Sequence, residues 1–257
     1  MNADKKIRAR PRPIDLAAAG GRVMDISVIL PTYCERDNIE NLISAIETSL
    51  LPLGRKIEIL VVDDNSPDQT AEVVRAHPAR PGVQVKCFVR TQERGLATAI
   101  KYGIQRSSGD KVVVMDTDFN HSPTNIPQMV ELLDEYDLVI GSRFVRGGGM
   151  EDKKRYVFSL IYNWFIQLVL WHGIRDSLSG FFAMRRQTLF ALDLEGIFRG
   201  YGEYFIRLTY GAFRRGRTII EVPVFYTLRQ HGFSKSKFGE MLRDYTLTAL
   251  SLRLTRS

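Results

Sequence analysis

The sequence predicts an α/β fold with a mainly parallel sheet flanked by helices, because short apolar runs alternate with helix-like segments. The apolar runs are rich in β-branched residues and almost uninterrupted, as expected for strands covered on both faces. They are Ile26–Leu30, Ile57–Val62, Val83–Val89, Lys111–Met115 and Leu138–Ile140. The helix-like segments between them lie at about Asn38–Leu50, Pro67–Ala76, Leu96–Ser107 and Pro123–Glu135. This order favours a doubly wound sheet.

Two helix starts carry local signals. Ser66-Pro67-Asp68-Gln69 places a capping serine before a proline, with a glutamine three residues after the cap, and Ser122-Pro123 repeats the first part. Acidic strand ends precede both starts. Because ligands of open α/β sheets bind beyond the carboxyl ends of the strands, these acids are candidate ligand contacts.

Beyond Ser142 the alternation is less regular. We expect a strongly apolar helix that ends near Trp171, a helix at about Glu203–Arg214 and a strand at Thr218–Val222. The tail from Phe238 to Leu254 is typical of an amphipathic helix.

The composition is that of an ordinary globular protein with a basic surface. The 257 residues are 44% hydrophobic and 25% charged, with a formal net charge of +7. A chain of this length suffices for one large core. Its charge indicates an anionic partner: nucleic acid, an anionic membrane face or a phosphorylated substrate. Cys34 and Cys87 lie in different segments, so we expect a reducing compartment and no disulfide framework.

Residues 1–24 are expected to form a disordered basic arm. Its lysines and arginines lie between Lys5 and Arg22, and no apolar stretch follows the first of them, which argues against a signal peptide. Prolines and glycines disfavour regular structure there. Such an arm is either a solvated tail or an electrostatic anchor at a membrane surface.

The most informative stretch is Val113–Asp118, where an apolar strand runs into two carboxylates, Asp116 and Asp118, separated by one residue. Alternating residues at a strand end can direct both carboxylates to one side. A hard divalent cation takes oxygen ligands and often shares them with substrate phosphates. Acidic pairs are common in turns, but this position after a buried strand favours a metal site.

Two further segments reach the same edge of the predicted sheet. Asp63 and Asp64 follow the second strand, where a carboxylate either stabilises a turn or accepts hydrogen bonds from a nucleobase or ribose. The loop Pro31–Glu35 follows the first strand; there Tyr33 could stack on a base and Glu35 could add a polar contact. Taken singly, these loop residues carry no functional signal.

Eight motifs taken together resemble glycosyltransferase family 2, and within it the dolichol-phosphate mannosyltransferase group. They occur in the expected order and extend over most of the chain. They are Pro31–Glu35, Val61–Thr70, Arg94–Leu96, Met115–Pro123, Gly141–Phe144, Asp176–Phe181, Glu221–Pro223 and Arg229–Lys235.

The resemblance implies a GT-A fold, a Rossmann-like arrangement, over residues 25–237. It implies that the Pro31–Glu35 loop, with Asp63 or Asp64, surrounds the nucleoside of a nucleoside-diphosphate sugar. Arg229 and Lys235 match basic residues that grip the donor phosphates.

The resemblance also implies a metal cofactor, Mg²⁺ or Mn²⁺, held on the donor diphosphate by Asp116 and Asp118. Asn120 stands where relatives often carry glutamine as a further metal ligand, although its side chain is shorter. Together with Arg229, the metal would neutralise the charge that grows on the departing diphosphate.

The implied reaction is inverting transfer of a hexosyl group, with mannose from GDP-mannose favoured, to a polyprenyl or dolichyl phosphate. The acceptor oxygen is already largely ionised near neutral pH, so no strong general base is required. Its phosphate needs cations on the side opposite the donor. Our candidates are Arg143 and Arg155, with Ser159 as a hydroxyl donor.

The helix at about 154–172 has a narrow polar stripe on an apolar cylinder: Arg155, Ser159, Asn163 and Gln167 recur every four residues. Three alternatives are open. A transmembrane span needs about 20 apolar residues and this run is shorter. A buried core helix would also suit the apolar side chains. We favour an interfacial helix with its apolar side in lipid and its polar stripe toward the site.

With the second amphipathic helix at 238–257, this predicts a peripheral protein without a transmembrane helix on the cytoplasmic side of a membrane. A membrane-anchoring partner protein is an alternative means of attachment.

Other functions are open from the sequence. The same fold could transfer a sugar, such as glucose from UDP-glucose, to undecaprenyl phosphate or to a saccharide hydroxyl, which needs a general base. His121, His172, Asp176 and Glu203 are the candidates for that base. Nucleic-acid binding is disfavoured because the cations are scattered and no recognition motif accompanies them. A nucleotide-binding scaffold without catalysis is disfavoured because both metal acids are present.

Overall fold

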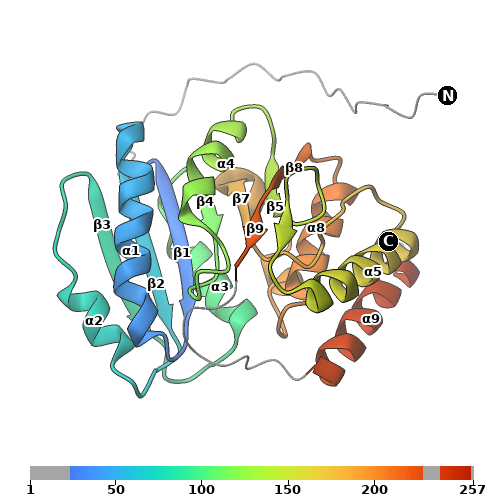
Figure 1. The fold of residues 1–257 in the computed structure, drawn as a ribbon, viewed down its shortest axis with the longest axis horizontal. Helices are drawn as coiled ribbons and strands as arrows, with labels where there is room; N and C mark the ends of the chain where they lie inside the picture. The colour runs from blue at the N-terminus through green and yellow to red at the C-terminus, as the bar shows by residue number, and fades with distance from the viewer. Residues whose placement is uncertain (1–23, 228–237, 256–257) are drawn as a thin grey trace.

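The computed structural model describes residues 24–227 and 238–255 and confirms the predicted α/β architecture, a mainly parallel seven-stranded sheet flanked by helices (Figure 1). The strand order is β3-β2-β1-β4-β7-β5-β8. In chain order these strands are β1 (Ile26–Thr32), β2 (Ile57–Asp63), β3 (Val83–Val89), β4 (Lys111–Val114), β5 (Leu138–Ser142), β7 (Phe182–Arg185) and β8 (Ile219–Pro223). A separate parallel pair joins β6 (Gly149–Met150) to β9 (Phe225–Tyr226).

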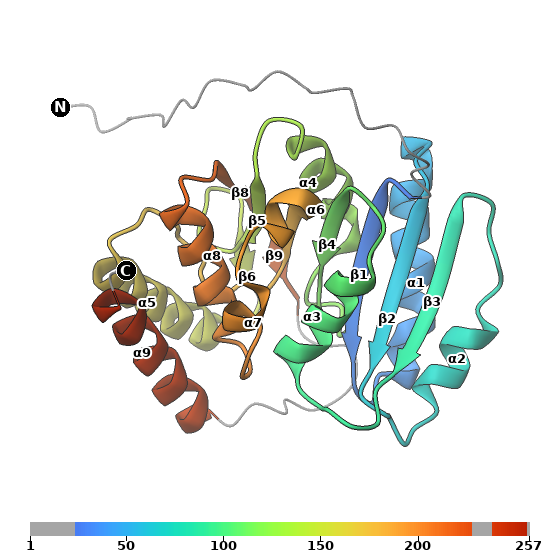
Figure 2. The same ribbon diagram turned by 180° about the vertical axis from the view of Figure 1, so that it is seen from behind.

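Helices cover both faces of the sheet, which is why its strands are apolar throughout. One face packs against α1 (Arg36–Leu50), α2 (Thr70–Ala76) and α4 (Ile126–Leu132). The other face packs against α3 (Leu96–Arg106), α6 (Arg186–Phe190), α7 (Leu194–Ile197) and α8 (Tyr204–Arg214), seen from behind in Figure 2. Short 3₁₀ turns, η1 (Leu51–Leu53) and η2 (Pro123–Asn125), follow α1 and precede α4.

The chain reverses direction across the sheet between β1 and β4. It runs from β1 outward to β2 and β3, then returns to place β4 on the other side of β1, parallel to it. The loops that leave β1 and β4 therefore reach the same carboxyl edge. The helices that follow them, α1 and α4, pack on one face of the sheet, whereas α3 covers the other. A crevice at such a switch point, beyond the carboxyl ends of the strands, is where doubly wound proteins bind ligands.

Strand β7 was not predicted and is antiparallel to both neighbours, β4 and β5. It has four residues, too few for a periodic signal, and is buried through its pairing with strands distant in the chain. The short elements β6, β9, α6 and α7 were also missed, because each depends on tertiary contacts more than on local sequence.

The predicted start of α2 at Pro67 is wrong, because the helix begins at Thr70. The Ser66 hydroxyl does not cap the helix but donates to the Asp63 carboxylate. Asp68 instead accepts from the Thr70 backbone N–H at 3.1 Å, and Gln69 adopts a left-handed conformation (φ 67°). The three residues after Ser66 thus form a turn that brings the loop back toward Asp63.

Two long helices, α5 (Lys153–Leu170) and α9 (Phe238–Leu254), lie side by side at one end of the molecule (Figures 1 and 2). Tyr162 of α5 donates to the Leu242 carbonyl oxygen of α9 at 3.0 Å. A small apolar cluster that includes Ile166, Tyr210 and Tyr245 joins the pair to α8.

The alternative of a buried core helix for α5 is wrong. Only its Asn163, Ile166 and Leu170 are buried. Ile161, Trp164 and Leu168 are 61%, 65% and 59% exposed, and Leu247, Leu250 and Leu254 extend the apolar surface onto α9. Within the two described stretches, no helix combines the length and apolar character needed to cross a bilayer.

Candidate functional site

The loop that follows β4 carries Asp116 and Asp118 to the carboxyl edge of the sheet, at the switch point. Asp118 is buried, and its carboxylate accepts hydrogen bonds from the Asn120 backbone N–H at 3.1 Å and from the Asn120 side chain at 2.8 Å. Phe119 between them takes a left-handed conformation (φ 60°) that turns the chain back. The Asp116 side chain is 42% exposed, so one carboxylate is anchored and the other faces solvent.

The donor set suits a hard divalent cation. In the part of the chain that the structure describes, no group of three or more His, Cys, Asp or Glu side chains could hold a metal ion. A pair of carboxylates leaves most coordination positions to phosphate oxygens and water, as Mg²⁺ usually requires. In this structure Asn120 presents its amide nitrogen to Asp118, so its position orients that carboxylate, and its role as a metal ligand stays a prediction.

The loops that leave β1 and β2 are joined by hydrogen bonds. The Cys34 N–H donates to the Ser66 hydroxyl at 2.9 Å, and the Ser66 N–H donates to the Asp63 carboxylate at 2.9 Å. Cys34 has a left-handed φ of 56°, and the Glu35 N–H donates to the Thr70 hydroxyl at 3.1 Å. The predicted donor loop Pro31–Glu35 and Asp63 therefore form one unit at the carboxyl edge of the sheet.

Tyr33 in this loop has a cationic neighbour. The Arg94 guanidinium carbon lies 5.5 Å from the centre of the Tyr33 ring. Arg94 belongs to a motif that the sequence analysis singled out without a role. Its position beside the donor loop could not be deduced from spacing, because it depends on where α3 packs.

The carboxylate of Asp64, like that of Asp63, is engaged within the protein. Asp64 accepts from Arg90 Nε at 2.7 Å and from the Gly95 N–H at 2.7 Å, and both side chains of the ion pair are buried. The pair holds the 90–95 loop against β2. Both acids are thus buried and hydrogen-bonded within the protein, and the contact of Asp63 or Asp64 with a nucleoside stays a prediction.

Arg143 and Asp176 form a second buried ion pair. Asp176 accepts from Arg143 Nε at 2.8 Å, from Nη2 at 2.7 Å and from the Arg143 backbone N–H at 3.0 Å. Burial alone would lower the pKa of Arg143, but the paired carboxylate outweighs it and raises the pKa above the usual value. A contact of Arg143 with an acceptor phosphate would have to coexist with this pair, and it stays a prediction.

The polar stripe of α5 runs from the exposed Arg155 to the buried Asn163. Asn163 is buried; its amide oxygen accepts from the Ser177 N–H at 2.7 Å and its nitrogen donates to the Ser159 carbonyl oxygen at 3.0 Å. Arg155 is exposed at the first turn, where Asp152 caps the helix by accepting from the Arg155 N–H at 3.0 Å. Arg155 and Ser159 therefore lie at the end of α5 that follows β6.

None of the four residues predicted as a general base for a saccharide acceptor is in a state that favours this role. Asp176 is held by Arg143, and Glu203 lies 3.5 Å from Arg207. His121 and His172 are buried, and this burial lowers the pKa of each to about 4. A neutral imidazole with so low a pKa is a weak base, so the geometry disfavours the saccharide alternative.

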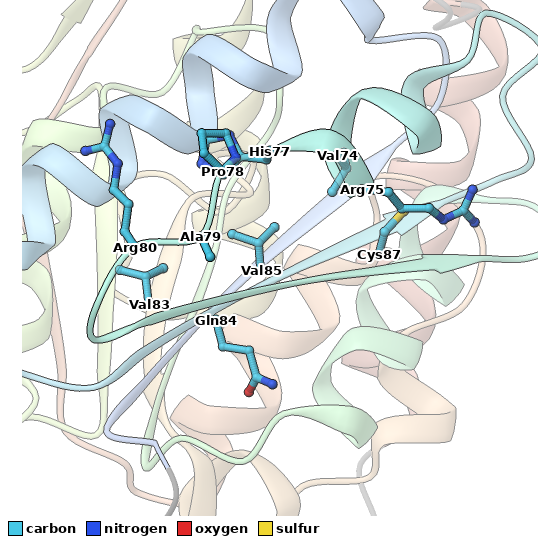
Figure 3. Close-up of a pocket in the computed structure, with 10 residues that line it drawn as sticks. All are labelled: Val74, Arg75, His77, Pro78, Ala79, Arg80, Val83, Gln84, Val85 and Cys87. Carbon is cyan, nitrogen blue, oxygen red and sulfur yellow. The ribbon is translucent and has the colours of Figure 1, made fainter.

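Two predicted residues, Arg229 and Lys235, lie outside the described residues, as does the basic arm of residues 1–23. A separate pocket of about 360 Å³ lies between the end of α2, the following loop and β3 (Figure 3). None of the predicted site residues lines it.

Residues 27–191 match the model of glycosyl transferase family 2, which covers more than half of the chain. The chain belongs to this family and is a glycosyltransferase, as its motifs predicted. The fold and the acidic loop at the switch point are consistent with this class.

Several curated relatives are similar over most of the chain. A dolichol-phosphate mannosyltransferase of Pyrococcus furiosus is 38% identical over 86% of this chain, which spans only 62% of that protein's length. A polyprenol monophosphomannose synthase of Mycolicibacterium smegmatis is 35% identical over 84% of this chain and 82% of its own. An undecaprenyl-phosphate mannosyltransferase of Micrococcus luteus is 35% identical over 90% of this chain and 96% of its own.

Among solved structures, glucosyl-3-phosphoglycerate synthase of Mycobacterium tuberculosis shares the fold. Its complex with Mn²⁺, UDP and phosphoglyceric acid superimposes with a TM-score of 0.68 at 24% identity, over 90% of this chain and 79% of that one. Its complex with Mg²⁺ and UDP superimposes with a TM-score of 0.66 at 23% identity, over 91% of this chain and 81% of that one. The predicted GT-A fold is therefore confirmed.

Breaking the Arg143–Asp176 pair should destabilise the protein. In Asp176→Asn the buried guanidinium loses its carboxylate, and we expect the free energy of unfolding to fall by about 3–5 kcal/mol in urea titrations. The exposed pair of Arg75 and Glu72 is the control, because Glu72→Gln should change stability by only about 0–1 kcal/mol. Equal effects of the two variants would contradict the assignment.

Proposed function

We propose that this chain transfers a hexosyl group, with mannose favoured, from a nucleoside-diphosphate sugar to a polyprenyl phosphate at a membrane surface, with inversion. The observation that carries the proposal is the Asp116–Asp118 pair at the β1/β4 switch point, in a chain whose relatives are named for mannosyl transfer to lipid phosphates. GDP-mannose is the favoured donor.

On the donor side, Tyr33, Glu35 and Asp63 would contact the nucleoside, since their loops meet beside the crevice. Asp116 and Asp118 would hold Mg²⁺ or Mn²⁺. The bound ion supplies positive charge that offsets the charge growing on the leaving diphosphate.

Further donor contacts come from the sequence alone. Asn120 as a third ligand, and Arg229 and Lys235 as phosphate contacts, follow from the family pattern. These three residues would complete the donor side.

On the acceptor side, Arg155 and Ser159 are the proposed phosphate contacts. Both lie in the first two turns of α5, on the stripe that continues to buried Asn163. An ionised phosphate must be oriented but need not be deprotonated, so its transfer reaction does not require a general base. This agrees with the state of the candidate bases, which are ion-paired or have a low pKa. Arg143 would support this region through Asp176.

The exposed apolar surface of α5 and α9 would rest in the lipid headgroup region. It is flanked by the exposed cations Lys153 and Lys154, which favour an anionic leaflet. An anionic leaflet and cysteines that remain thiols, Cys34 and Cys87, both support the cytoplasmic side. A membrane-anchoring partner protein would add to this attachment.

A second donor is kept as an alternative, because solved neighbours with this fold carry UDP and UDP-glucose. UDP-glucose would then be the donor, with undecaprenyl phosphate as an acceptor. A panel of radiolabelled GDP-mannose and UDP-glucose with a short-chain prenyl phosphate distinguishes the two.

In that panel, Asp118→Asn should lower transfer by about 10²–10³-fold, because the metal loses a charged ligand. EDTA should abolish transfer by the parent enzyme, and added Mn²⁺ should restore it. Asp134→Asn, which removes an exposed carboxylate paired with Lys111, is the control and should retain full activity. Near-normal turnover by Asp118→Asn in a folded protein would refute the metal role.

Arg155→Ala should affect the acceptor and spare the donor. We expect the KM for prenyl phosphate to rise about tenfold, the effect of losing one charge-assisted contact, while the KM for the nucleotide sugar stays within about twofold. Arg106→Ala on α3 removes an exposed cation elsewhere and should change neither constant. Equal increases in both constants would show that α5 does not line the acceptor site.

Membrane binding should depend on the apolar side of α5. Replacing Ile161, Trp164 and Leu168 with serine should lower partitioning onto anionic phospholipid vesicles at least tenfold, since roughly 1.5–3 kcal/mol accompanies burial of each large apolar side chain. Phe190→Ser changes an exposed aromatic residue on α6 and serves as the control in the same sedimentation assay. Unchanged sedimentation of the triple variant would contradict the proposed surface.

A further inference from the structure

The loop that carries the acidic pair is tied to the protein body by a buried histidine. His121 has no exposed surface, and its ring stacks on Phe181 with the centroids 4.8 Å apart. Its Nδ1 accepts from the Asp116 backbone N–H at 3.0 Å. Its Nε2 lies 2.9 Å from the Tyr226 hydroxyl. Because Nδ1 is an acceptor, the proton of the neutral ring is on Nε2 and is donated to Tyr226.

Tyr226 connects His121 to a second loop, which contains Ser179. Its hydroxyl donates to the Ser179 carbonyl oxygen at 2.9 Å, and its ring centre lies 4.8 Å from the guanidinium carbon of Arg143. The next residue, Thr227, donates to the Phe119 carbonyl oxygen at 3.0 Å. The acidic loop is thus held by β9 and the residue after it at two points, Phe119 and His121, both of which follow Asp118.

We propose that His121, itself held by Tyr226, is a positioning residue for the metal pair. Asp118 is oriented within the loop by Asn120, and His121 does the corresponding work for Asp116 by fixing its main chain. This inference rests on the proposed function, since it assigns His121 to a divalent cation on Asp116 and Asp118. Both ring nitrogens are engaged in hydrogen bonds, so His121 acts through Asp116 and not on the substrate.

The choice of histidine follows from the two bonds. The ring must accept from a backbone N–H on one side and donate to a hydroxyl on the other, inside an apolar stack. Groups that orient metal-ligating residues typically contribute about 10–100-fold to metal affinity or activity. The loss of the acceptor would leave the Asp116 N–H without this partner, and the main chain that carries the Asp116 carboxylate would lose this restraint.

Two substitutions separate the two bonds. The side-chain oxygen of His121→Asn can replace Nδ1, so this variant keeps the bond to Asp116. His121→Gln reaches toward Tyr226 but withdraws the acceptor from Asp116. Tyr226→Phe removes a single oxygen atom and tests the support of the ring if the His121 variants fold poorly.

Mn²⁺ binding is measured by electron paramagnetic resonance in the presence of GDP, together with kcat and the Mn²⁺ concentration that gives half-maximal transfer. We expect His121→Gln to weaken Mn²⁺ binding about 10–100-fold. His121→Asn should restore most of that loss, and Tyr226→Phe should give an intermediate weakening. Leu192→Ala, a buried change on the opposite face of the sheet, is the control for lost stability and should bind Mn²⁺ as the parent does.

The outcomes are distinguishable. If the parent binds Mn²⁺ and transfers sugar, and His121→Gln and Tyr226→Phe bind Mn²⁺ equally well, the positioning role is refuted while the proposed function stands. The role is also refuted if Leu192→Ala weakens Mn²⁺ binding as much as His121→Gln at a matched melting temperature. If the parent itself neither binds Mn²⁺ with nucleotide nor requires it, the metal role and this inference fail together.

Discussion

The site depends on one topological constraint: the chain places β2 on one side of β1 and β4 on the other, with all three strands parallel. The loops that leave β1, β2 and β4 therefore come together at one carboxyl edge of the sheet, where ligands of open α/β sheets bind. The strands beneath it are buried on both faces, so their ends cannot shift without disturbing the core. A rigid edge of this kind suits a reaction in which the orientation of a diphosphate decides the rate.

Near the carboxyl edge of the sheet, buried polar groups are satisfied by partners that are far apart in the sequence. Asp64 meets Arg90, Asp176 meets Arg143, and His121 meets Tyr226. Each pair takes a loop that would otherwise be free to move and fixes it to the sheet. Since an unpaired buried charge is costly, these pairs form together with the fold and define a single arrangement of the loops.

The sequence was sufficient for the parallel strands, most helices, the acidic loop and the family. It was insufficient where a side chain has two plausible partners. A cation in a motif suggests an anionic ligand, so the sequence predicts that Arg143 contacts an acceptor phosphate. In the structure Arg143 forms an ion pair with Asp176. Ser66 stands where a helix cap is expected, although its hydroxyl is taken by Asp63. Arg94 stands in a motif to which the sequence assigned no role, and Tyr226 had no visible signal.

By itself the sequence determined what is local. Apolar runs specify strands buried on both faces, and Asp116 and Asp118 stand directly after one of them. Both features can be recognised within a single segment, because they depend only on the spacing of apolar residues and on which residues are neighbours in the chain. Only the tertiary structure decided which of the polar residues face a ligand and which face each other. It inserted antiparallel β7 between β4 and β5 and turned the apolar side of α5 outward. Those outcomes depend on contacts between distant segments, and the free energy of such contacts cannot be inferred from a local sequence pattern.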